Sequence, residues 1–510
     1  MHITRCWKNI YIAAAVAATL VAASAVADDR FEPFNSPELR PLTGHSDPSM
    51  RSSHGTQFPQ SSESSLSPPA GPVDSPQPPV ATTAARDDGL LHQILYDRFQ
   101  REKAPDVAGA AAAKPKPWYE KFRIRGYTQF RYSDLVQIDH GSARPNHAGD
   151  ASISDDDTFL IRRARLILFG DVSPHLFVYF QPDFVNTPPG SRDQNHFPQI
   201  RDWYGDVYVD TDKQYRFRVG QSKVPYGWEN LQSSSNRLPF DRNDAFNSAT
   251  KNERDLGVFF YWTPLWAQKL YREINDKRLK HSGNYGVFGF GAYDGQGGSL
   301  GEQNNELHIV SRFNVPFQLP NGQYLEAAIQ GYTGRYVVLG SRIRPLGLGT
   351  SDIIPAGTKE GGNPGGLLDQ RLGWSFIWYP QPLGFQAEWT IGRGPALNEE
   401  QTALERRSVY GGYAMALYRI DSSWGRFFPF VRWQYFRGGY RSFDNAPFTT
   451  IDEWNIGIEW QIRREFELSF EYLITDRTNL RAISSSSAVS RASYGQFDGQ
   501  VARIQFQVNY

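Results

Sequence analysis

The sequence predicts an all-β protein, a 16-stranded antiparallel transmembrane β-barrel with long extracellular loops and short periplasmic turns. Three observations lead to this prediction. The last ten residues alternate between apolar and polar side chains and end on the aromatic Tyr510, similar stretches recur from residue 118 onward, and the connections between them alternate between long and short. A soluble β-sandwich would also alternate along its strands, but nothing in a sandwich requires its loop lengths to alternate.

The first 27 residues predict a signal peptide. Arg5 and Lys8 precede an apolar run over residues 10–23, and small residues follow up to Ala27. A membrane anchor is the alternative, but the run is short for a membrane span and lacks a basic flank that would stop its transfer. We therefore expect cleavage after Ala27.

Composition narrows the class of function. The single cysteine, Cys6, lies in the expected signal peptide, so the mature chain would hold neither disulfides nor thiolate metal sites. Basic and acidic residues are balanced, 54 of each, which gives no reason to expect a nucleic-acid partner. The mean hydropathy of −0.53 would suit a soluble protein, yet a transmembrane barrel turns only every second strand residue toward lipid. An aromatic content of 14% fits aromatic girdles at the membrane interfaces, although carbohydrate-binding β-proteins share it.

The segment before the first strand predicts little packed structure. Residues 28–88 are rich in Ser, Pro and Ala and are predicted to form a disordered linker. In residues 89–103, Leu91, Ile94 and Leu95 recur at helical spacing, which predicts a short amphipathic helix, either solitary or part of a small oligomerising coil. Residues 104–117 form a second linker, and the barrel domain takes residues 118–510.

The barrel domain contains sixteen stretches with the alternation of a membrane strand, an even number that returns the chain to the side where it began. They cover residues 122–133, 158–169, 175–184, 201–209, 215–222, 255–262, 284–293, 306–315, 323–333, 371–379, 385–391, 409–419, 427–437, 452–462, 466–475 and 500–510. Connections after odd-numbered stretches are long and those after even-numbered ones are short, with one exception at residues 263–283. The paired Arg162 and Arg163 blur the second stretch, so its facing stays open.

Charged residues fall on faces predicted to line the inside of the barrel. Phe122, Ile124 and Phe130 share one face of the first stretch, opposite a row of arginines. The basic candidates are Arg123, Arg125, Arg131, Arg216, Arg218 and Arg503, and the acidic candidates on later stretches are Glu388, Glu453, Glu459, Glu467 and Glu471. Basic and acidic ribs across one pore would create a transverse field that orients dipolar solutes and keeps apolar ones out.

The connection over residues 223–254 is by count the third extracellular loop. It carries the cations Lys223, Arg237, Arg242, Lys251 and Arg254 against the anions Glu229, Asp241, Asp244 and Glu253. Such near balance does not favour an anion trap, because each nearby carboxylate cancels much of the field. Ion pairs that hold the loop against the wall explain these charges better.

Two parts of the chain resemble the phosphate-selective porin O and P family. One is Gly-Gln-Ser-Lys-Val-Pro-Tyr-Gly-Trp-Glu at residues 220–229, followed by Arg-Asp-Leu-Gly-Val at residues 254–258. The other is Arg-Gly-Tyr-Thr-Gln-Phe-Arg at residues 125–131, followed by Ile-Arg-Arg-Ala-Arg-Leu at residues 161–166. The resemblance covers residues 122–510. It implies a sixteen-stranded porin of the bacterial outer membrane, usually a homotrimer, whose pore is narrowed by inward-folded loops.

Composition and resemblance together predict a passive channel for small hydrophilic solutes with a mild preference for anions. Its partners would be outer-membrane lipid, copies of itself, and small inorganic anions or polar solutes. A substrate-specific channel for phosphate or other anions is one alternative, and a surface adhesin or plugged barrel that uses the Gly-rich residues 334–370 is another. The sequence shows no recognisable catalytic motif, so we expect no enzyme activity, no cofactor and no metal site.

Overall fold

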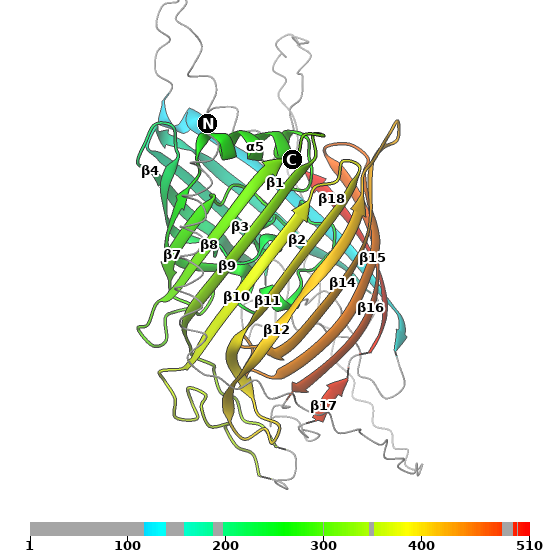
Figure 1. Ribbon diagram of the computed structural model, residues 1–510. Helices are drawn as coiled ribbons and strands as arrows, with labels where there is room; N and C mark the ends of the chain where they lie inside the picture. Colours follow the sequence, from blue (N-terminus) through cyan, green and yellow to red (C-terminus); the bar gives the residue numbers. More distant parts are fainter. Residues whose placement is uncertain are drawn as a thin grey trace, which may run out of the picture. The chain divides into compact units, whose positions relative to one another are not determined.

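Alternating side chains close one antiparallel sheet on itself in the computed structural model (Figure 1). The structure describes residues 117–138, 158–186, 197–298, 300–345, 351–481, 493–496 and 498–510. Of the 18 strands in the sheet, β13 (Ile420–Ser422) and β17 (Ser493–Gln496) are short additions beside β14 and β16. Sixteen strands therefore make the wall, as predicted. The predicted signal peptide, linkers and amphipathic helix of residues 1–116 lie outside the described residues.

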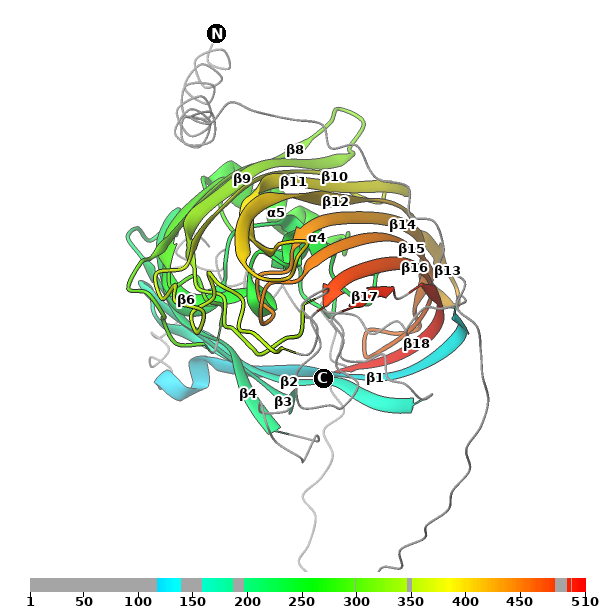
Figure 2. The same ribbon diagram turned by 90° about the horizontal axis from the view of Figure 1, so that it is seen from below.

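The strands of the wall lie close to their predicted ranges. In chain order they are β1 (Phe122–Ile138), β2 (Thr158–Ser173), β3 (Leu176–Asn186), β4 (Phe197–Tyr208), β5 (Tyr215–Lys223), β6 (Arg254–Trp262), β7 (Phe288–Tyr293), β8 (His308–Gln318), β9 (Tyr324–Tyr336), β10 (Leu367–Trp378), β11 (Leu383–Leu397), β12 (Leu404–Tyr418), β14 (Gly425–Gly439), β15 (Phe448–Gln461), β16 (Phe466–Arg481) and β18 (Gly499–Asn509). Figure 2 shows the ring that they form.

Alternation sends apolar side chains outward and polar side chains inward. Along β5, Tyr215, Phe217 and Val219 are exposed, whereas Arg216 and Arg218 are buried on the inner face. Large apolar side chains are likewise exposed on the outer faces of strands such as β10 and β15. This distribution suits a barrel that is surrounded by lipid and encloses a polar interior.

The first and last strands close the barrel at the C-terminal residue. β1 pairs with β18, and beyond β18 the N–H of Tyr510 donates to the carbonyl of Gly126 at 3.0 Å. The N–H of Gly126 donates in return to the carbonyl of Tyr510 at 2.6 Å. A Cβ atom on Gly126 would lie 2.4 Å from the Tyr510 ring, so this glycine makes room for the terminal aromatic.

Short turns and long loops lie at opposite ends of the barrel. The helix η3 (Trp118–Lys121), the C-terminus and the short turns share one end (Figure 1), which in an outer-membrane barrel is the periplasmic end. The opposite, extracellular end carries long connections such as residues 337–366. The loop predicted after the eleventh stretch is shorter than expected, because β11 and β12 extend until residues 398–403 are left between them.

The one long connection predicted at the periplasmic end, residues 263–283, contains a helix. Residues 263–287 join β6 to β7 and include α5 (Leu265–Asp276), which buries Ala267, Tyr271 and Ile274. Pro264 stands directly before α5, where its fixed φ costs the helix no hydrogen bond. Among the described residues, no helix has both the length and the apolar character needed to cross a membrane.

Candidate functional site

The connection between β5 and β6 folds into the barrel, and we call its residues 224–253 the inner loop. It contains α3 (Trp228–Leu231), α4 (Asp244–Asn247) and η4 (Lys251–Glu253). The N–H of Val224 donates to the carbonyl of Glu253 at 3.0 Å and closes the neck of the loop. Figure 2 shows α4 within the ring of strands. The loop that the sequence singled out by count therefore narrows the interior.

Apolar packing seats the inner loop against the later strands. Tyr226 and Phe246 are buried in a cluster with Tyr332 of β9 and Phe436 of β14. The rings of Tyr226 and Tyr332 meet edge-on with their centres 4.9 Å apart, a favourable geometry for two aromatic rings. The loop thus buries these two aromatic side chains against β9 and β14.

Acidic residues predicted to line the pore hold this loop. Glu388 of β11 accepts hydrogen bonds from the N–H groups of Trp228 and Glu229 at 2.6 and 2.8 Å, donors that the start of α3 leaves without helical partners. Glu471 of β16 accepts from the N–H of Phe240 at 2.9 Å. Arginines of the wall meet carboxylates of the loop in return: Arg432 pairs with Glu229, Arg477 with Asp244 and Arg503 with Asp241.

The acidic rib expected from the sequence is therefore not a bare pore wall. Glu388, Glu453, Glu459 and Glu471 are almost fully buried, and Glu467 is partly exposed. These carboxylates bond to the inner loop, to wall arginines or to neighbouring polar side chains, as the pairs Arg477 to Glu453 and Arg503 to Glu471 illustrate. Because these pairs cancel charge at its source, the acidic half of the expected transverse field is much reduced.

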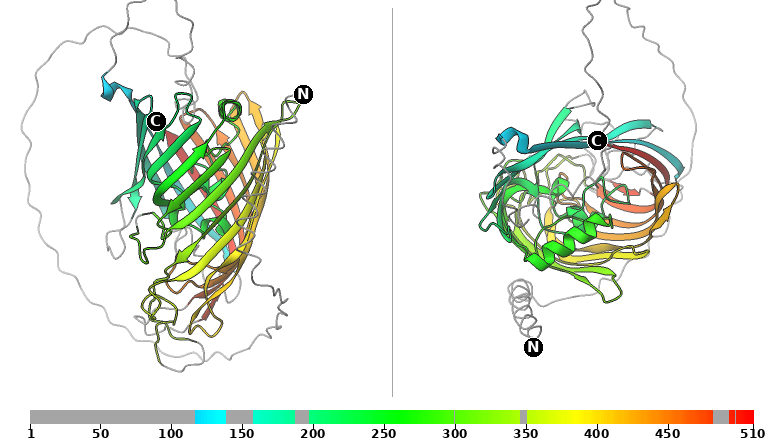
Figure 3. Two further views of the ribbon diagram at one scale, coloured as in Figure 1. Left: turned by 60° about the vertical axis from the view of Figure 1, so that its left-hand side comes forward. Right: turned by 90° about the horizontal axis from the view of Figure 1, so that it is seen from above.

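A second segment supports the inner loop from the periplasmic end, and we call residues 263–287 the strap. The side chains of Gln232 and Asn236 donate to the carbonyls of Lys280 and His281 at 2.6 and 2.7 Å. Lys280 forms a buried ion pair with Glu459 of β15. The strap begins after β6 and ends before β7, so its ion pair with β15 shows that it crosses the interior of the barrel. Figure 3 shows α5 inside the outline of the ring. The inner loop and the strap together obstruct part of the interior of the barrel.

The wall formed by β2 to β5 is basic. These strands carry Arg163, Arg165, Arg201, Arg216 and Arg218 on the inside of the barrel, and Arg165 also donates to the hydroxyl of Ser234 in the inner loop at 3.0 Å. The aspartates among them form close pairs: Arg165 with Asp183 at 2.8 Å, Arg254 with Asp202 at 2.9 Å and Arg218 with Asp206 at 2.8 Å. Arginines outnumber aspartates on this wall, so it keeps a net positive charge.

Two β-bulges contribute to the basic wall. The register between β1 and β2 passes over Arg162, and the register between β3 and β4 passes over Arg201. A bulge interrupts the alternation of faces, which is why the facing of the second stretch stayed open in the sequence. The Nε atom of Arg201 lies 3.9 Å from Asp183, so the second bulge turns this arginine toward the interior.

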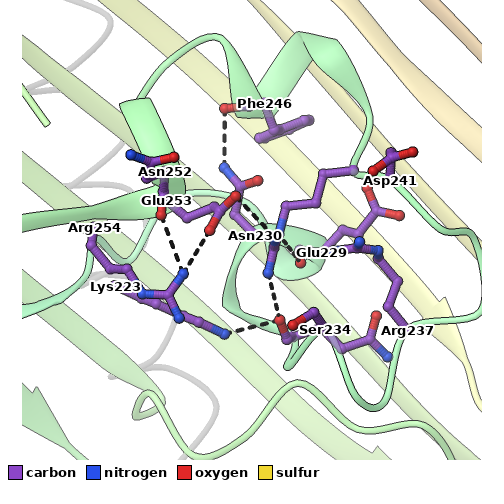
Figure 4. Close-up of polar contacts among 12 residues, drawn as sticks. Lys223, Glu229, Asn230, Ser234, Arg237, Asp241, Phe246, Asn252, Glu253 and Arg254 are labelled. Atoms are coloured by element: carbon purple, nitrogen blue, oxygen red, sulfur yellow. Dashed lines mark hydrogen bonds and ion pairs between the residues drawn. The ribbon is translucent and has the colours of Figure 1, made fainter. Parts of the chain in front are cut away.

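The predicted basic residues divide into three groups. Arg123 is exposed near the periplasmic end of β1. Arg125, Arg216 and Arg218 lie on the inner wall. The others bond to the inner loop or within it, and some of these contacts are visible in Figure 4. Arg131 and Arg503 contact Asp241, and Arg242 and Arg254 both pair with Glu253. Lys223 donates to the carbonyls of Leu231 and Gln232, and Arg237 donates to those of Pro239 and Phe240.

Two buried groups of the inner loop, Glu253 and Arg237, have shifted pKa values. Burial raises the pKa of Glu253, but Arg242, Arg254 and Arg201 outweigh it and hold the pKa of this carboxyl well below its usual range. Burial, with Arg242 close by, lowers the pKa of Arg237 to about 9. Both groups are therefore ionised at neutral pH.

Sequence reasoning missed Arg163, Arg165 and Arg201 as inward residues. The pattern Arg-x-Arg at residues 163–165 was a usable signal, because alternate residues share a face. No comparable signal marks Arg201, since its facing depends on the register between two strands.

Comparison with known proteins supports an outer-membrane barrel. No curated protein sequence matches the chain. Solved structures that resemble it include OmpT of Vibrio cholerae in its trimer form (TM-score 0.46, 10% identity, 76% of this chain and 99% of that one) and the outer-membrane channel DcaP of Acinetobacter baumannii (0.44, 12%, 76% and 97%). An anion-selective porin from Comamonas acidovorans also matches (0.42, 10%, 76% and 99%). The family model described as phosphate-selective porin O and P matches residues 130–510, and the chain belongs to this family of bacterial outer-membrane porins.

Proposed function

We propose that the chain is a passive diffusion channel for small hydrophilic solutes with a mild preference for anions, and that solutes pass along the inner faces of β2 to β5. The observation that carries this proposal is the unequal pairing of the inward charges. Carboxylates of the later strands bond to the inner loop, the strap and wall arginines, whereas arginines outnumber aspartates on β2 to β5. An unbalanced positive wall in a narrow pore attracts anions and repels cations.

The test is the reversal potential of single channels in a gradient of potassium chloride. The wild-type porin should be modestly selective for chloride. Arg163→Gln and Arg201→Gln should each shift the potential toward potassium, because each removes one charge from the wall. Arg406→Gln, on an exposed position of β12, is the matched control and should leave the potential unchanged. A wild-type channel selective for potassium would contradict the proposal.

A substrate-specific anion channel is the second candidate, and one observation favours it. The Nε atoms of Arg163 and Arg201 are buried and donate to no residue that the structure describes. Two such donors on neighbouring strands could bind one phosphate or carboxylate group. Inorganic phosphate that blocks the chloride current with saturation at low concentration would favour this candidate, and a weak, linear effect would favour diffusion.

We also propose a homotrimer in outer-membrane lipid, which is what the family resemblance implies. The exposed apolar side chains on the outer faces of the strands suit burial in lipid or against another copy of the chain. Native mass measurement of the detergent-extracted porin tests this assembly.

A further inference from the structure

Aromatic side chains form a row across the basic wall. In register, Phe169 of β2 faces Tyr179 of β3, and Tyr179 faces Tyr204 of β4. The ring centres are 6.4 Å apart in the first pair and 5.1 Å apart in the second, whose rings are nearly parallel at 13°. We call these three residues the aromatic row. The interior of a porin is usually polar, so three adjacent rings facing it require an explanation.

Burial beneath another element does not supply that explanation. Other inward aromatic side chains, such as Tyr332 and Phe436, are buried with the inner loop packed against them. Phe169 is buried beside Ile167, Phe177 and Tyr208 of the same wall, whereas Tyr179 and Tyr204, which pack against this cluster, are partly exposed. On β5 the position opposite Tyr204 is Gly220, and the β5 side chain that lies over the Tyr204 ring is that of Arg218. The aromatic row therefore faces the interior.

Flat cations border the row. The guanidinium carbon of Arg218 lies 3.8 Å from the ring centre of Tyr204, and that of Arg125 lies 5.1 Å from the ring centre of Phe169. Arg218 also donates two hydrogen bonds to Asp206, at 2.8 and 2.9 Å, which fix the plane of its guanidinium group. The wall thus offers planar π surfaces beside planar positive groups.

A further cation adjoins this surface. Arg216, two residues before Arg218 on β5, lies with its guanidinium carbon 4.8 Å from the ring centre of Tyr261. Its Nε atom donates to no residue that the structure describes. A donor of this kind suits a carboxylate oxygen, since a hydrogen bond between two ionised groups is stronger than a neutral one.

We propose that the aromatic row, with Arg125, Arg216 and Arg218, binds planar anions of the aromatic carboxylate class on their way through the channel. The ring of the solute stacks on Tyr179 and Tyr204, and its carboxylate meets the bordering guanidinium groups. This inference rests on the proposed anion path along β2 to β5 and names the solute class for which that path is best suited.

The experiment compares two anions of equal charge and similar size, benzoate and cyclohexanecarboxylate. Each is added to the full-length porin in a planar bilayer, and the concentration that halves the chloride current is measured. Benzoate should block at about a three- to tenfold lower concentration, because only a flat ring stacks well on tyrosine. Simple apolar attraction would favour the saturated ring, so the order of the two anions separates stacking from burial of apolar area.

Variants of the aromatic row test whether it causes the preference for benzoate over cyclohexanecarboxylate. Tyr179→Leu and Tyr204→Leu should abolish the preference for benzoate, whereas Tyr204→Phe, which keeps the ring, should retain it. Tyr215→Leu, on the outer face of β5, is the matched control and should behave like the wild type. The reversal potential in potassium chloride is recorded for every variant, so that loss of stacking is distinguished from loss of anion preference.

The outcomes separate the two proposals. A wild-type porin that prefers chloride but is blocked equally by both carboxylates would overturn this inference and leave the proposed function standing. A wild-type porin without anion preference would overturn the proposed function and this inference with it. If the leucine variants fail to assemble, the wild-type comparison and Tyr204→Phe still decide the question.

Discussion

Glu388 is the residue whose removal should loosen the inner loop most directly, because it accepts two backbone N–H groups of α3. Glu388→Gln leaves one neutral amide oxygen where two carboxylate oxygens accepted these hydrogen bonds. The change should weaken the binding of the inner loop to the wall by about 1–3 kcal/mol. Single-channel recording should show a larger and noisier conductance. Glu405→Gln, at an exposed position of β12, is the control. Equal conductance in both variants would mean that Glu388 does not hold the loop.

His281 should make the strap sensitive to acid. Burial lowers its pKa to about 3, from an ordinary value of 6.5, and its Nδ1 atom accepts a hydrogen bond from the N–H of Gly283 at 3.2 Å. The unfolded chain binds this proton below pH 6.5 and the folded chain does not. The stability that neutral His281 contributes is therefore complete above pH 6.5 and declines as the pH falls toward 3.

Between pH 7.5 and pH 5 this decline amounts to about 2 kcal/mol in the free energy of unfolding. His281→Asn, whose amide oxygen can accept from Gly283, should lose less stability over the same interval. Thermal unfolding in detergent at the two pH values measures the difference, with His175→Asn at an exposed turn as the control. The same acid sensitivity in wild type and His281→Asn would exclude His281 as its source.

At the scale of elements, the strap depends on one buried ion pair. Lys280 and Glu459 are 2% and 3% exposed, so Lys280→Met or Glu459→Gln leaves a buried group without its partner and should cost about 3–5 kcal/mol. The double variant should cost less than the two single changes together, and conductance should rise in each single variant. Lys269→Met breaks a pair on α5 whose lysine is 73% exposed, and it should change little. Strict additivity of the two single changes would show that the pair is not coupled.

The closing strand offers a second test at this scale. Tyr510 bonds to the backbone of Gly126, and its hydroxyl lies 3.3 Å from that of Thr128. Tyr510→Ala should slow assembly, since the last strand loses the aromatic that packs where the barrel closes. The fraction of heat-modifiable barrel in the outer membrane measures this effect, with Tyr418→Ala on an exposed position of β12 as the control. Normal assembly of Tyr510→Ala would contradict it.

The elements differ in how far the sequence could predict them. Strands such as β5 and β18 were predictable because apolar and polar residues alternate along their sequences with a period of two. The helix α5 was missed, although Ala267, Tyr271 and Ile274 recur at helical spacing after Pro264. The role of Glu388 could not be read at all, because its partner Trp228 lies 160 positions away and no local pattern records such a contact.

At the scale of the whole molecule, two inserted segments, the inner loop and the strap, occupy part of the interior of the barrel. The inner loop enters from the extracellular end and the strap from the periplasmic end, and they meet at Gln232 and Lys280. The charges of the later strands stabilise these insertions, while β2 to β5 carry an excess of arginines on the inside of the barrel. We therefore propose that solutes travel along one wall of the barrel and not through its middle.

The accessibility of introduced thiols tests this path, because the only cysteine in the sequence, Cys6, lies in the predicted signal peptide. Arg201→Cys places a thiol on the basic wall, and Asn455→Cys places one on β15, at a position that is fully buried. A small anionic methanethiosulfonate added during current recording should reduce the current of Arg201→Cys within seconds to minutes and leave that of Asn455→Cys unchanged. Rapid reaction at Asn455→Cys with none at Arg201→Cys would contradict the proposed path.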